Sequence, residues 1–364
     1  MAKAKKETNN LDLSADEIKK VIMDKYDKES ITPITQVIPT GIFPLDYILG
    51  GGIPAGRIFE ICGSPSSGKT TIISRLVGNM CKMFPNKLVM YADLECKVDP
   101  KWLETNGLSN TTNFHLFAPE KAETLFDYIS DALIQKDTTS LIVIDSIAAT
   151  ILEKELDDPL KDTYGVIAKF YQKLVNTTRG KLANSNTILV CINQMRDKIG
   201  TYFGGQTTTG GAALKYAYAQ KIRTSKSSTN FDNETHDINN FSFTTKIKCE
   251  KNNIYTDGFE SEILVTPKTG IDLKANAAKQ MISLGFIEKS GSWFTLPDGT
   301  RVQGEEKTIM YLAQNPKLIL DFYKNYIITN FDYKGRLQAD LLDCLFSEEQ
   351  KETKNQLEEG GTNV

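Results

Sequence analysis

An eight-residue segment, residues 63–70 with the sequence GSPSSGKT, constrains the fold of this chain more than any other feature. It matches the pattern G-x-x-x-x-G-K-[ST], in which backbone N–H groups surround a phosphate. An apolar run, residues 58–62, precedes the segment, and a helical pattern follows from Thr71. This strand–loop–helix order predicts an α/β fold that binds a nucleoside triphosphate, and it disfavours an ordinary Ser/Gly loop.

The loop and the residue after it are expected to surround the phosphates. Lys69 supplies a mobile positive charge, and Thr70 offers its hydroxyl to Mg²⁺. The residues predicted to contact the nucleotide are Gly63, Ser64, Pro65, Ser66, Ser67, Gly68, Lys69, Thr70 and Thr71.

Composition sets the broad class of protein. With 364 residues, of which 40% are hydrophobic, the chain is long enough for one large core and a smaller second unit. The first thirty residues mix both charges and lack the apolar run of a signal peptide, and the other apolar runs are too short to span a bilayer. A cytoplasmic protein without membrane contact is therefore expected.

Charge and cysteine usage exclude several other classes. The six cysteines show no C-x-x-C spacing and the chain has only two histidines, so neither a zinc site nor a disulfide framework is predicted. The net charge of −3 argues against a uniformly basic nucleic-acid-binding protein but allows a local basic groove.

Acidic residues follow two further predicted strands. Asp93 and Glu95 come after the buried run 87–92, and Asp145 ends the run 141–144 in the form of a Walker B motif. The carboxyl ends of parallel strands line the ligand crevice of such folds, so Asp145 is expected to bind Mg²⁺ with Thr70. A carboxylate there can also orient or deprotonate water. Asp93 is interpreted as a solvated loop acid.

A glycine- and threonine-rich stretch, residues 195–213, follows the predicted strand 187–192 and the amides Asn193 and Gln194. An amide can hold a phosphate or a water molecule without adding charge. Glycines let the stretch approach nucleic-acid phosphates, and its basic and apolar side chains can contact phosphates and bases. Composition alone favours another interpretation, a flexible loop that becomes ordered at a subunit contact.

Four parts are predicted along the chain. Residues 1–39 contain a short helix, with Ser14 and Glu17 as its capping box, and a strand at 34–38. From composition alone they either pack on another part of the chain or on another subunit, as an oligomerisation arm, or form a loosely attached arm. Residues 40–269 form the core, in which antiparallel strands extend a mainly parallel sheet flanked by helices. A small α/β domain at 270–328 contains a helix, a hairpin and two helices, and an acidic, disordered tail at 329–364 follows.

Five motifs together resemble the bacterial RecA recombinase family from about residue 37 to 316. In chain order they are GSPSSGKT, YADLECKVDPKW, LIVIDSIAA, SNTILVCINQMRDKIGTYFG and TTTGGAALK. The combination of INQ-x-R-x-KIG with FG and TTTGG is highly specific. On these motifs the chain is identified as a member of that family, in a divergent or phage-borne version with a RecA-type P-loop ATPase core.

The resemblance implies that the ligands are ATP and Mg²⁺ and that the activity is a DNA-dependent ATPase. Lys69 and Thr70 would hold the β- and γ-phosphates and the metal, Asp145 would be the Walker B acid, and Glu95 would activate water. Gln194 would link the γ-phosphate to the DNA-binding loop.

The resemblance also assigns the adenine contacts. Asp99 and Trp102 match positions that contact the base, and Trp102 replaces the usual tyrosine while keeping a stacking surface.

Single-stranded DNA, homologous duplex DNA and further copies of this chain in a helical filament are the implied partners. Residues 153–163 and 195–209 would be the DNA-binding loops, and the N-terminal helix and strand would dock on the neighbouring subunit. The implied DNA-contacting residues are Arg196, Lys198, Ile199, Phe203, Thr208, Thr209, Gly210, Gly211 and Lys169.

Some positions depart from the family pattern. Lys251 matches the first of two lysines that reach the neighbouring subunit's ATP, but Asn253 stands at the second, and Asn176 replaces a basic residue. An amide can bind a phosphate but cannot neutralise it, so weaker DNA-stimulated hydrolysis is expected.

Three functions follow as hypotheses. The first is an ATP-dependent recombinase that pairs homologous strands and exchanges them in DNA repair. The second is a RecA-fold filament that binds DNA with weak turnover. The third is a hexameric helicase or loader, which should lack TTTGG after FG and the small C-terminal domain.

Overall fold

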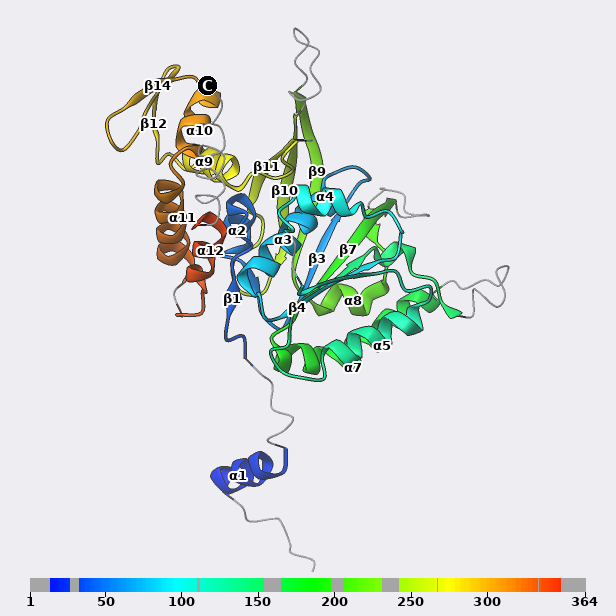
Figure 1. The fold of residues 1–364 in the computed structure, drawn as a ribbon. Coiled ribbons are helices and arrows are strands. Elements are labelled where there is room, and N and C mark those ends of the chain that lie inside the picture. The colour runs from blue at the N-terminus through cyan, green and yellow to red at the C-terminus, as the bar shows by residue number, and fades with distance from the viewer. Residues whose placement is uncertain are drawn as a thin grey trace, which may run out of the picture. The chain divides into compact units, whose positions relative to one another are not determined.

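The computed structural model describes residues 14–26, 33–109, 112–153, 165–197, 206–230, 242–266, 268–332 and 334–347 (Figure 1). It separates into two compact units, residues 1–33 and residues 34–364. Within the described part of the chain, every helix is too short or too polar to span a bilayer.

In the described part of the first unit, helix α1 (Ala15–Tyr26) lies where the sequence predicts a helix. The backbone N–H of Ser14 donates to Glu17 Oε2 at 2.9 Å, and the backbone N–H of Glu17 donates to Ser14 Oγ at 3.3 Å. The predicted capping box is therefore confirmed, since both N-terminal donors are satisfied.

A nine-stranded sheet forms the centre of the second unit, in the order β11-β10-β9-β3-β7-β6-β4-β5, with β8 paired to β7. The strands from β9 to β5 pair in parallel, whereas β10, β11 and β8 pair antiparallel with their neighbours. The predicted α/β class, a mainly parallel sheet with added antiparallel strands, is confirmed. The strands are β3 (Ile58–Gly63), β4 (Leu88–Asp93), β5 (Phe114–Phe117), β6 (Thr139–Asp145), β7 (Ile188–Asp197), β8 (Gln206–Thr208), β9 (Tyr218–Asn230), β10 (Ser242–Asn252) and β11 (Glu260–Val265).

Helices cover both faces of this sheet (Figure 1). Successive strand residues point to opposite faces, so Val143 packs in the cluster that includes α3, and Ile144 packs in the cluster that includes α5, α7 and α8. Every residue of β3 and β6 is buried, as expected for strands covered on both sides. The helices are α2 (Phe43–Leu49), α3 (Lys69–Met83), α4 (Pro100–Thr105), α5 (Ala122–Ala132), α7 (Val166–Ser185) and α8 (Gly211–Ala217).

Two of these helices are short and are not among the elements that the sequence predicts. Helix α2 ends directly before Gly50, whose φ of 75° is left-handed. Helix α8 occupies the end of the Gly/Thr stretch, which the sequence predicts as a loop, and β9 begins directly after it, at Tyr218. Buried Leu214 explains the helix, because it anchors one face of α8 in the core.

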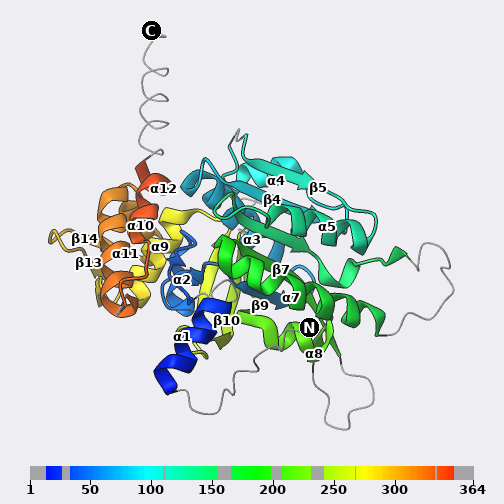
Figure 2. The same ribbon diagram turned by 90° about the horizontal axis from the view of Figure 1, so that it is seen from below.

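The small domain after the sheet has the predicted helix, hairpin and two helices, and one further strand. Figure 2 shows it beside α2 of the core, and α9 and α11 both contact α2. Its elements are α9 (Leu273–Ser283), β12 (Glu288–Ser290), β13 (Trp293–Thr295), β14 (Arg301–Gln303), α10 (Glu305–Ala313) and α11 (Pro316–Phe331).

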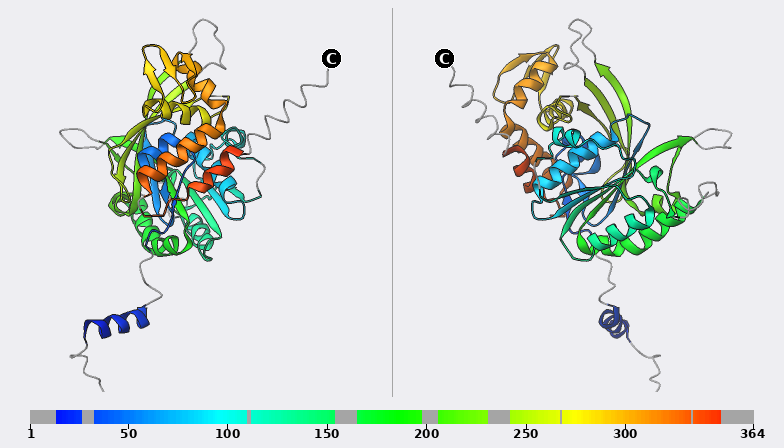
Figure 3. Two further views of the ribbon diagram at one scale, coloured as in Figure 1. Left: turned by 90° about the vertical axis from the view of Figure 1, so that its left-hand side faces the viewer. Right: turned by 45° about the vertical axis from the view of Figure 1, so that its right-hand side comes forward.

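Two segments differ from the predicted organisation. Helix α11 continues past residue 329, and η4 (Ala339–Leu342) and α12 (Asp343–Ser347) follow, with α12 packed on α3 (Figure 3). This part of the expected tail is ordered because its apolar side chains, including Leu345 and Phe346, are buried. Residues 348–364 lie outside the described residues.

The strand predicted for the arm belongs to the second unit instead. Strand β1 (Val37–Ile38) pairs with β2 (Ile53–Pro54) of the same chain. The backbone N–H of Val37 also donates to the Arg336 carbonyl at 2.9 Å. The chain's own C-terminal segment therefore satisfies part of this strand's backbone.

A buried carboxylate joins α2 to the small domain. Asp46 accepts hydrogen bonds from the backbone N–H of Thr40 at 2.8 and 2.9 Å, from the N–H of Gly41 at 3.3 Å and from the hydroxyl of Tyr323. Burial raises the pKa of Asp46 to about 7, although these hydrogen bonds oppose the shift. The ring of Tyr323 also stacks on Phe43, with centroids 4.2 Å apart.

The substitution Tyr323→Phe should lower the free energy of unfolding by about 2 kcal/mol near pH 8 and by about 1 kcal/mol near pH 5.5. The pKa of folded Asp46 lies above that of the unfolded chain, so the folded state takes up a proton as the pH falls through about 7. The lost hydrogen bond is therefore charge-assisted only at the higher pH. Urea denaturation at both pH values measures the difference.

The matched control is Tyr326→Phe, on the same helix, which should change the free energy of unfolding little at either pH. An equal loss at both pH values for Tyr323→Phe would contradict the proposed ionisation of Asp46.

Candidate functional site

The segment 63–70 lies between β3 and α3, as the sequence predicts. Gly68, at the start of α3, has a φ of 86°, and a Cβ there would lie 2.5 Å from Thr245 Oγ1, so only glycine fits. The pocket above the loop has a volume of about 310 Å³. Its lining residues are Ser66, Ser67, Gly68, Lys69, Thr70, Thr71, Lys226 and Phe243.

Lys69 folds back over the loop. Its Nζ donates to the carbonyl of Gly63 at 3.1 Å and to the carbonyl of Ser64 at 2.7 Å. Burial lowers the pKa of the ammonium group, although the nearby Asp145 carboxylate opposes the shift. A phosphate in the pocket offers this ammonium group a stronger, charged acceptor than the two carbonyls.

The predicted metal ligands lie side by side. Thr70 Oγ1 donates to Asp145 Oδ2 at 3.3 Å, and Tyr91 OH donates to the same oxygen at 2.7 Å. Burial raises the pKa of Asp145, and the Tyr91 hydrogen bond opposes the shift. A hydroxyl and a carboxylate oxygen are ligands that suit Mg²⁺, which completes its octahedron with water and phosphate oxygens. Among the described residues, no group of three or more His, Cys, Asp or Glu side chains offers a protein-only metal site.

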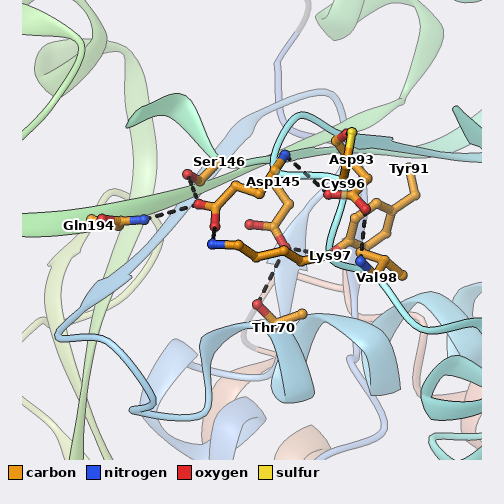
Figure 4. Close-up of polar contacts among 10 residues, drawn as sticks. Thr70, Tyr91, Asp93, Cys96, Lys97, Val98, Asp145, Ser146 and Gln194 are labelled. Carbon is orange, nitrogen blue, oxygen red and sulfur yellow. Dashed lines mark hydrogen bonds and ion pairs between the residues drawn. The ribbon is translucent and has the colours of Figure 1, made fainter. Parts of the chain in front are cut away.

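Glu95 follows the carboxyl end of β4 and accepts hydrogen bonds from three parts of the chain. The three donors, Ser146, Gln194 and Lys97, are labelled in Figure 4. Glu95 Oε1 accepts hydrogen bonds from Ser146 Oγ at 2.5 Å and from Gln194 Nε2 at 3.0 Å, and its Oε2 accepts one from Lys97 Nζ at 2.9 Å. Burial alone would raise the pKa of Glu95, but the hydrogen bonds from Ser146 and Lys97 outweigh burial and lower it. The carboxylate is therefore ionised at neutral pH.

The sheet explains why these side chains meet. Strands β4, β6 and β7 are parallel neighbours, so their carboxyl ends lie at one edge of the sheet. The sequence predicts Glu95 and Gln194 as site residues, and the structure brings them together. It misses Ser146 and Lys97, although Ser146 directly follows the Walker B acid and Lys97 lies two residues beyond Glu95.

Asp93 is not the solvated acid that the sequence suggests. It is 6% exposed and accepts hydrogen bonds from the backbone N–H of Glu95 at 3.2 Å and of Val98 at 2.8 Å. These bonds shape the turn that carries Glu95, so Asp93 has a structural role here.

The residues expected at the adenine lie in α4, which packs on α3. Asp99 caps this helix, with its Oδ1 accepting the backbone N–H of Lys101 at 2.9 Å, and Trp102 is half-buried in the first turn. Their contact with a base stays a prediction.

Lys251, expected at the subunit interface, lies on β10 with its Nζ donating to the Tyr216 carbonyl at 3.1 Å. Burial lowers its pKa. The backbone N–H of Asn253 donates to the Ala219 carbonyl at 2.9 Å. The interface role of both positions stays a prediction.

The ends of the predicted DNA-binding loop form a two-stranded ribbon. Strand β7 continues to Asp197 and pairs antiparallel with β8, so that Arg196 lies opposite Thr207 and Met195 opposite Thr208. Arg196 is exposed. Lys198, Ile199 and Phe203, and residues 154–163 of the other predicted loop, lie outside the described residues.

Asn193 connects this ribbon to the core. Its Nδ2 donates to the Thr209 carbonyl at 2.8 Å and to Glu60 Oε1 at 2.9 Å, and its Oδ1 accepts the Thr209 N–H at 3.3 Å. Glu60 is fully buried and also pairs with Lys221 Nζ at 3.1 Å. The sequence predicts Asn193 only as a phosphate or water ligand, because Glu60 and Thr209 are remote in the chain.

The paired glycines after Thr209 bring α8 onto α7. Gly210 and Gly211 have φ values of 104° and 80°, and a Cβ on Gly211 would lie 2.8 Å from the Cβ of Ala168. Lys169, the next residue of α7, is exposed. The predicted DNA-contacting residues Thr208, Thr209, Gly210, Gly211 and Lys169 therefore belong to adjoining elements, β8, α8 and α7.

These features define a class of protein. A P-loop, a hydroxyl–carboxylate pair that suits Mg²⁺ and a carboxylate–amide pair at the ends of neighbouring strands characterise a P-loop nucleotide-binding protein. The family model described as the RecA N-terminal domain matches residues 11–272, well over half of the chain. The chain belongs to the RecA family.

Individual relatives agree with this assignment. The chain is 34% identical over 291 residues to Protein RecA of Mycolicibacterium gilvum (strain PYR-GCK), which covers 79% of this chain and 81% of the relative. It is 32% identical to Protein RecA of Mycobacterium marinum (strain ATCC BAA-535 / M), covering 89% and 93% of the two chains. Among solved structures, the RadB recombinase matches with a TM-score of 0.47 and 20% identity, over 63% of this chain and 96% of that chain.

The substitution Asn193→Ala should destabilise the protein by about 3 kcal/mol, because it leaves buried polar groups on Glu60 and Thr209 without partners. It should also speed hydrogen exchange of the Thr209 amide at least tenfold. Exchange measured by mass spectrometry or NMR tests the second effect.

A matched control is Asn113→Ala, which removes an amide that donates to the carbonyls of Cys81, Phe84 and Lys87. It should destabilise the protein without faster exchange at Thr209. If both variants speed that exchange equally, Asn193 does not specifically hold the ribbon.

Proposed function

We propose that this chain is an ATP-dependent homologous recombinase, which forms a filament on single-stranded DNA and catalyses homologous pairing and strand exchange. Its membership of the RecA family supports this function. The observation that carries the proposal is the end of β7, where Gln194 donates to Glu95 and the adjacent Asn193 holds Thr209 of the predicted DNA-binding segment. One strand thus contacts both candidate sites.

ATP hydrolysis takes place, in this proposal, between the P-loop and Glu95. When bound, Mg²⁺ neutralises charge on the phosphates. Thr70 and Asp145 hold the ion, and Lys69 leaves the loop carbonyls to contact the phosphates. Glu95, whose pKa is lowered, is ionised and orients the attacking water and accepts its proton.

DNA binding uses the surface where β7, β8, α8 and α7 adjoin. Arg196 and Lys169 are exposed cations that neutralise backbone phosphates. Gln194 and Asn193 are consecutive, so a shift of Gln194 towards a γ-phosphate also moves the backbone of Asn193. Because Asn193 is hydrogen-bonded to Thr209, the shift reaches the ribbon.

A second candidate function is a DNA-binding filament with weak ATP turnover. It is favoured by Asn253, a neutral amide where the family pattern has a lysine. ATPase assays with and without single-stranded DNA separate the two functions, because only the recombinase requires DNA-stimulated hydrolysis and strand exchange. A helicase-type motor is disfavoured, since the TTTGG segment and the small C-terminal domain are both present.

The substitution Glu95→Gln should reduce DNA-stimulated ATP hydrolysis by about a hundredfold or more, as expected for loss of a general base. ATP binding should persist, and the protein should stay bound to single-stranded DNA. Phosphate release and fluorescence anisotropy of labelled DNA measure the two effects.

The control Glu104→Gln changes an exposed acid on α4 and should leave hydrolysis unaffected. Normal turnover in Glu95→Gln would remove Glu95 from the catalytic role.

The substitution Arg196→Ala should weaken binding of single-stranded DNA of any sequence. Loss of one phosphate contact should reduce the slope of log affinity against log salt by about 0.7. Titrations of labelled DNA over a salt series measure the slope. Arg179→Ala, which removes an exposed arginine elsewhere on α7, should leave it unchanged, and an unchanged slope in Arg196→Ala would exclude a phosphate contact.

A further inference from the structure

Lys97 lies two residues after Glu95, in the turn between β4 and α4. Its Nζ donates to Glu95 Oε2 at 2.9 Å. The Lys97 side chain is 76% exposed, whereas that of Glu95 is 18% exposed. The exposed side chain of Lys97 thus carries its ammonium group to a carboxylate that is largely shielded from solvent.

The two oxygens of Glu95 are held in different ways. Oε1 accepts hydrogen bonds from Ser146 and Gln194, which are placed by the strands β6 and β7 of the core. Oε2 accepts its hydrogen bond from Lys97, whose long, flexible type of side chain is mostly exposed to solvent. The fold therefore fixes one oxygen, while a movable cation occupies the other.

Lys97 also balances charge in the site. Its pKa is raised, first by the hydrogen bond and charge of Glu95, and further by the charges of Asp145 and Asp93. Lys97 therefore lies in the field of three carboxylates, of which only Glu95 is its hydrogen-bond partner among the described residues. An ion pair this exposed contributes little to stability, so a competing anion can displace Glu95 from Lys97.

A bound triphosphate is such an anion. A water molecule positioned for attack lies about 3–3.5 Å from the terminal phosphorus and within hydrogen-bond distance of its base. If Glu95 is that base, the water lies next to both the terminal phosphate and Glu95, to which Lys97 Nζ already donates. A change of side-chain rotamer can then move the ammonium group from Glu95 to the phosphate.

We infer that Lys97 is a second lysine of the nucleotide site, which donates to Glu95 in the absence of nucleotide and moves to the terminal phosphate of a bound triphosphate. The inference rests on the proposed function, which places that phosphate between the P-loop and Glu95. The move has two consequences. It frees Glu95 Oε2 to accept a hydrogen bond from water, and it makes the site discriminate ATP from ADP, which lacks the terminal phosphate.

The test is the substitution Lys97→Met, which keeps the aliphatic stem and removes the charge. Isothermal titration calorimetry with a non-hydrolysable ATP analogue and with ADP, both with Mg²⁺, measures the two affinities. We expect the affinity for the analogue to fall about tenfold, as loss of a charge-assisted hydrogen bond implies. The affinity for ADP should change less than twofold.

Two further variants sharpen the result. Lys97→Arg, which keeps the charge, should retain most of the preference for the triphosphate. Lys136→Met, which removes an exposed lysine from the turn before β6, should change neither affinity. An equal loss for both nucleotides in Lys97→Met, or no loss, would overturn the inference while leaving the proposed function intact. Failure of the unmodified protein to bind either nucleotide would overturn both.

Discussion

The hydrogen bonds that converge on Glu95 are the interaction on which the rest of the site depends. Ser146 follows β6, Gln194 lies in β7, and Glu95 follows β4. They meet because these parallel strands are neighbours in the sheet. The same edge carries Asp145, which contacts Thr70 of the P-loop helix. The strand order thus brings the candidate catalytic base, its amide partner and the candidate metal ligand Asp145 to one edge of the sheet, next to Thr70, which lines the pocket above the P-loop.

Strand β7 links this edge of the sheet to the predicted DNA-binding segment. Its consecutive residues Asn193 and Gln194 point to opposite faces of the sheet, as the pleat of a strand requires. Gln194 contacts Glu95 on the face of the nucleotide pocket, and Asn193 contacts Glu60 and Thr209 on the face of α7 and α8. In the proposed function, a displacement of this short segment changes the hydrogen bonds at both candidate sites and so couples the nucleotide state to DNA binding.

Local motifs explain which parts of this site the sequence predicts. Each of these motifs is a short continuous segment of the chain. Spacing and family resemblance are therefore enough to predict Lys69 in the P-loop, Asp145 as the Walker B acid, and the strand-end residues Glu95 and Gln194. The partner Ser146 and the hydrogen bonds of Asn193 to Thr209 depend on the strand order and on pairings between distant segments. The contact of Lys97 is local, but it depends on the turn that the hydrogen bonds of Asp93 shape. The sequence predicts residues 334–347 as part of a disordered tail because the composition of that tail is acidic. The few apolar residues that α12 buries become recognisable as core residues only in the structure.

Electron microscopy of the protein with single-stranded DNA tests the coupling between the two sites most directly. One sample contains a slowly hydrolysed ATP analogue with Mg²⁺, and the other contains ADP with Mg²⁺. We expect extended helical filaments on the DNA with the analogue and their loss or collapse with ADP. Closed rings, isolated molecules or identical filaments in both samples would contradict a nucleotide site that controls DNA binding through β7.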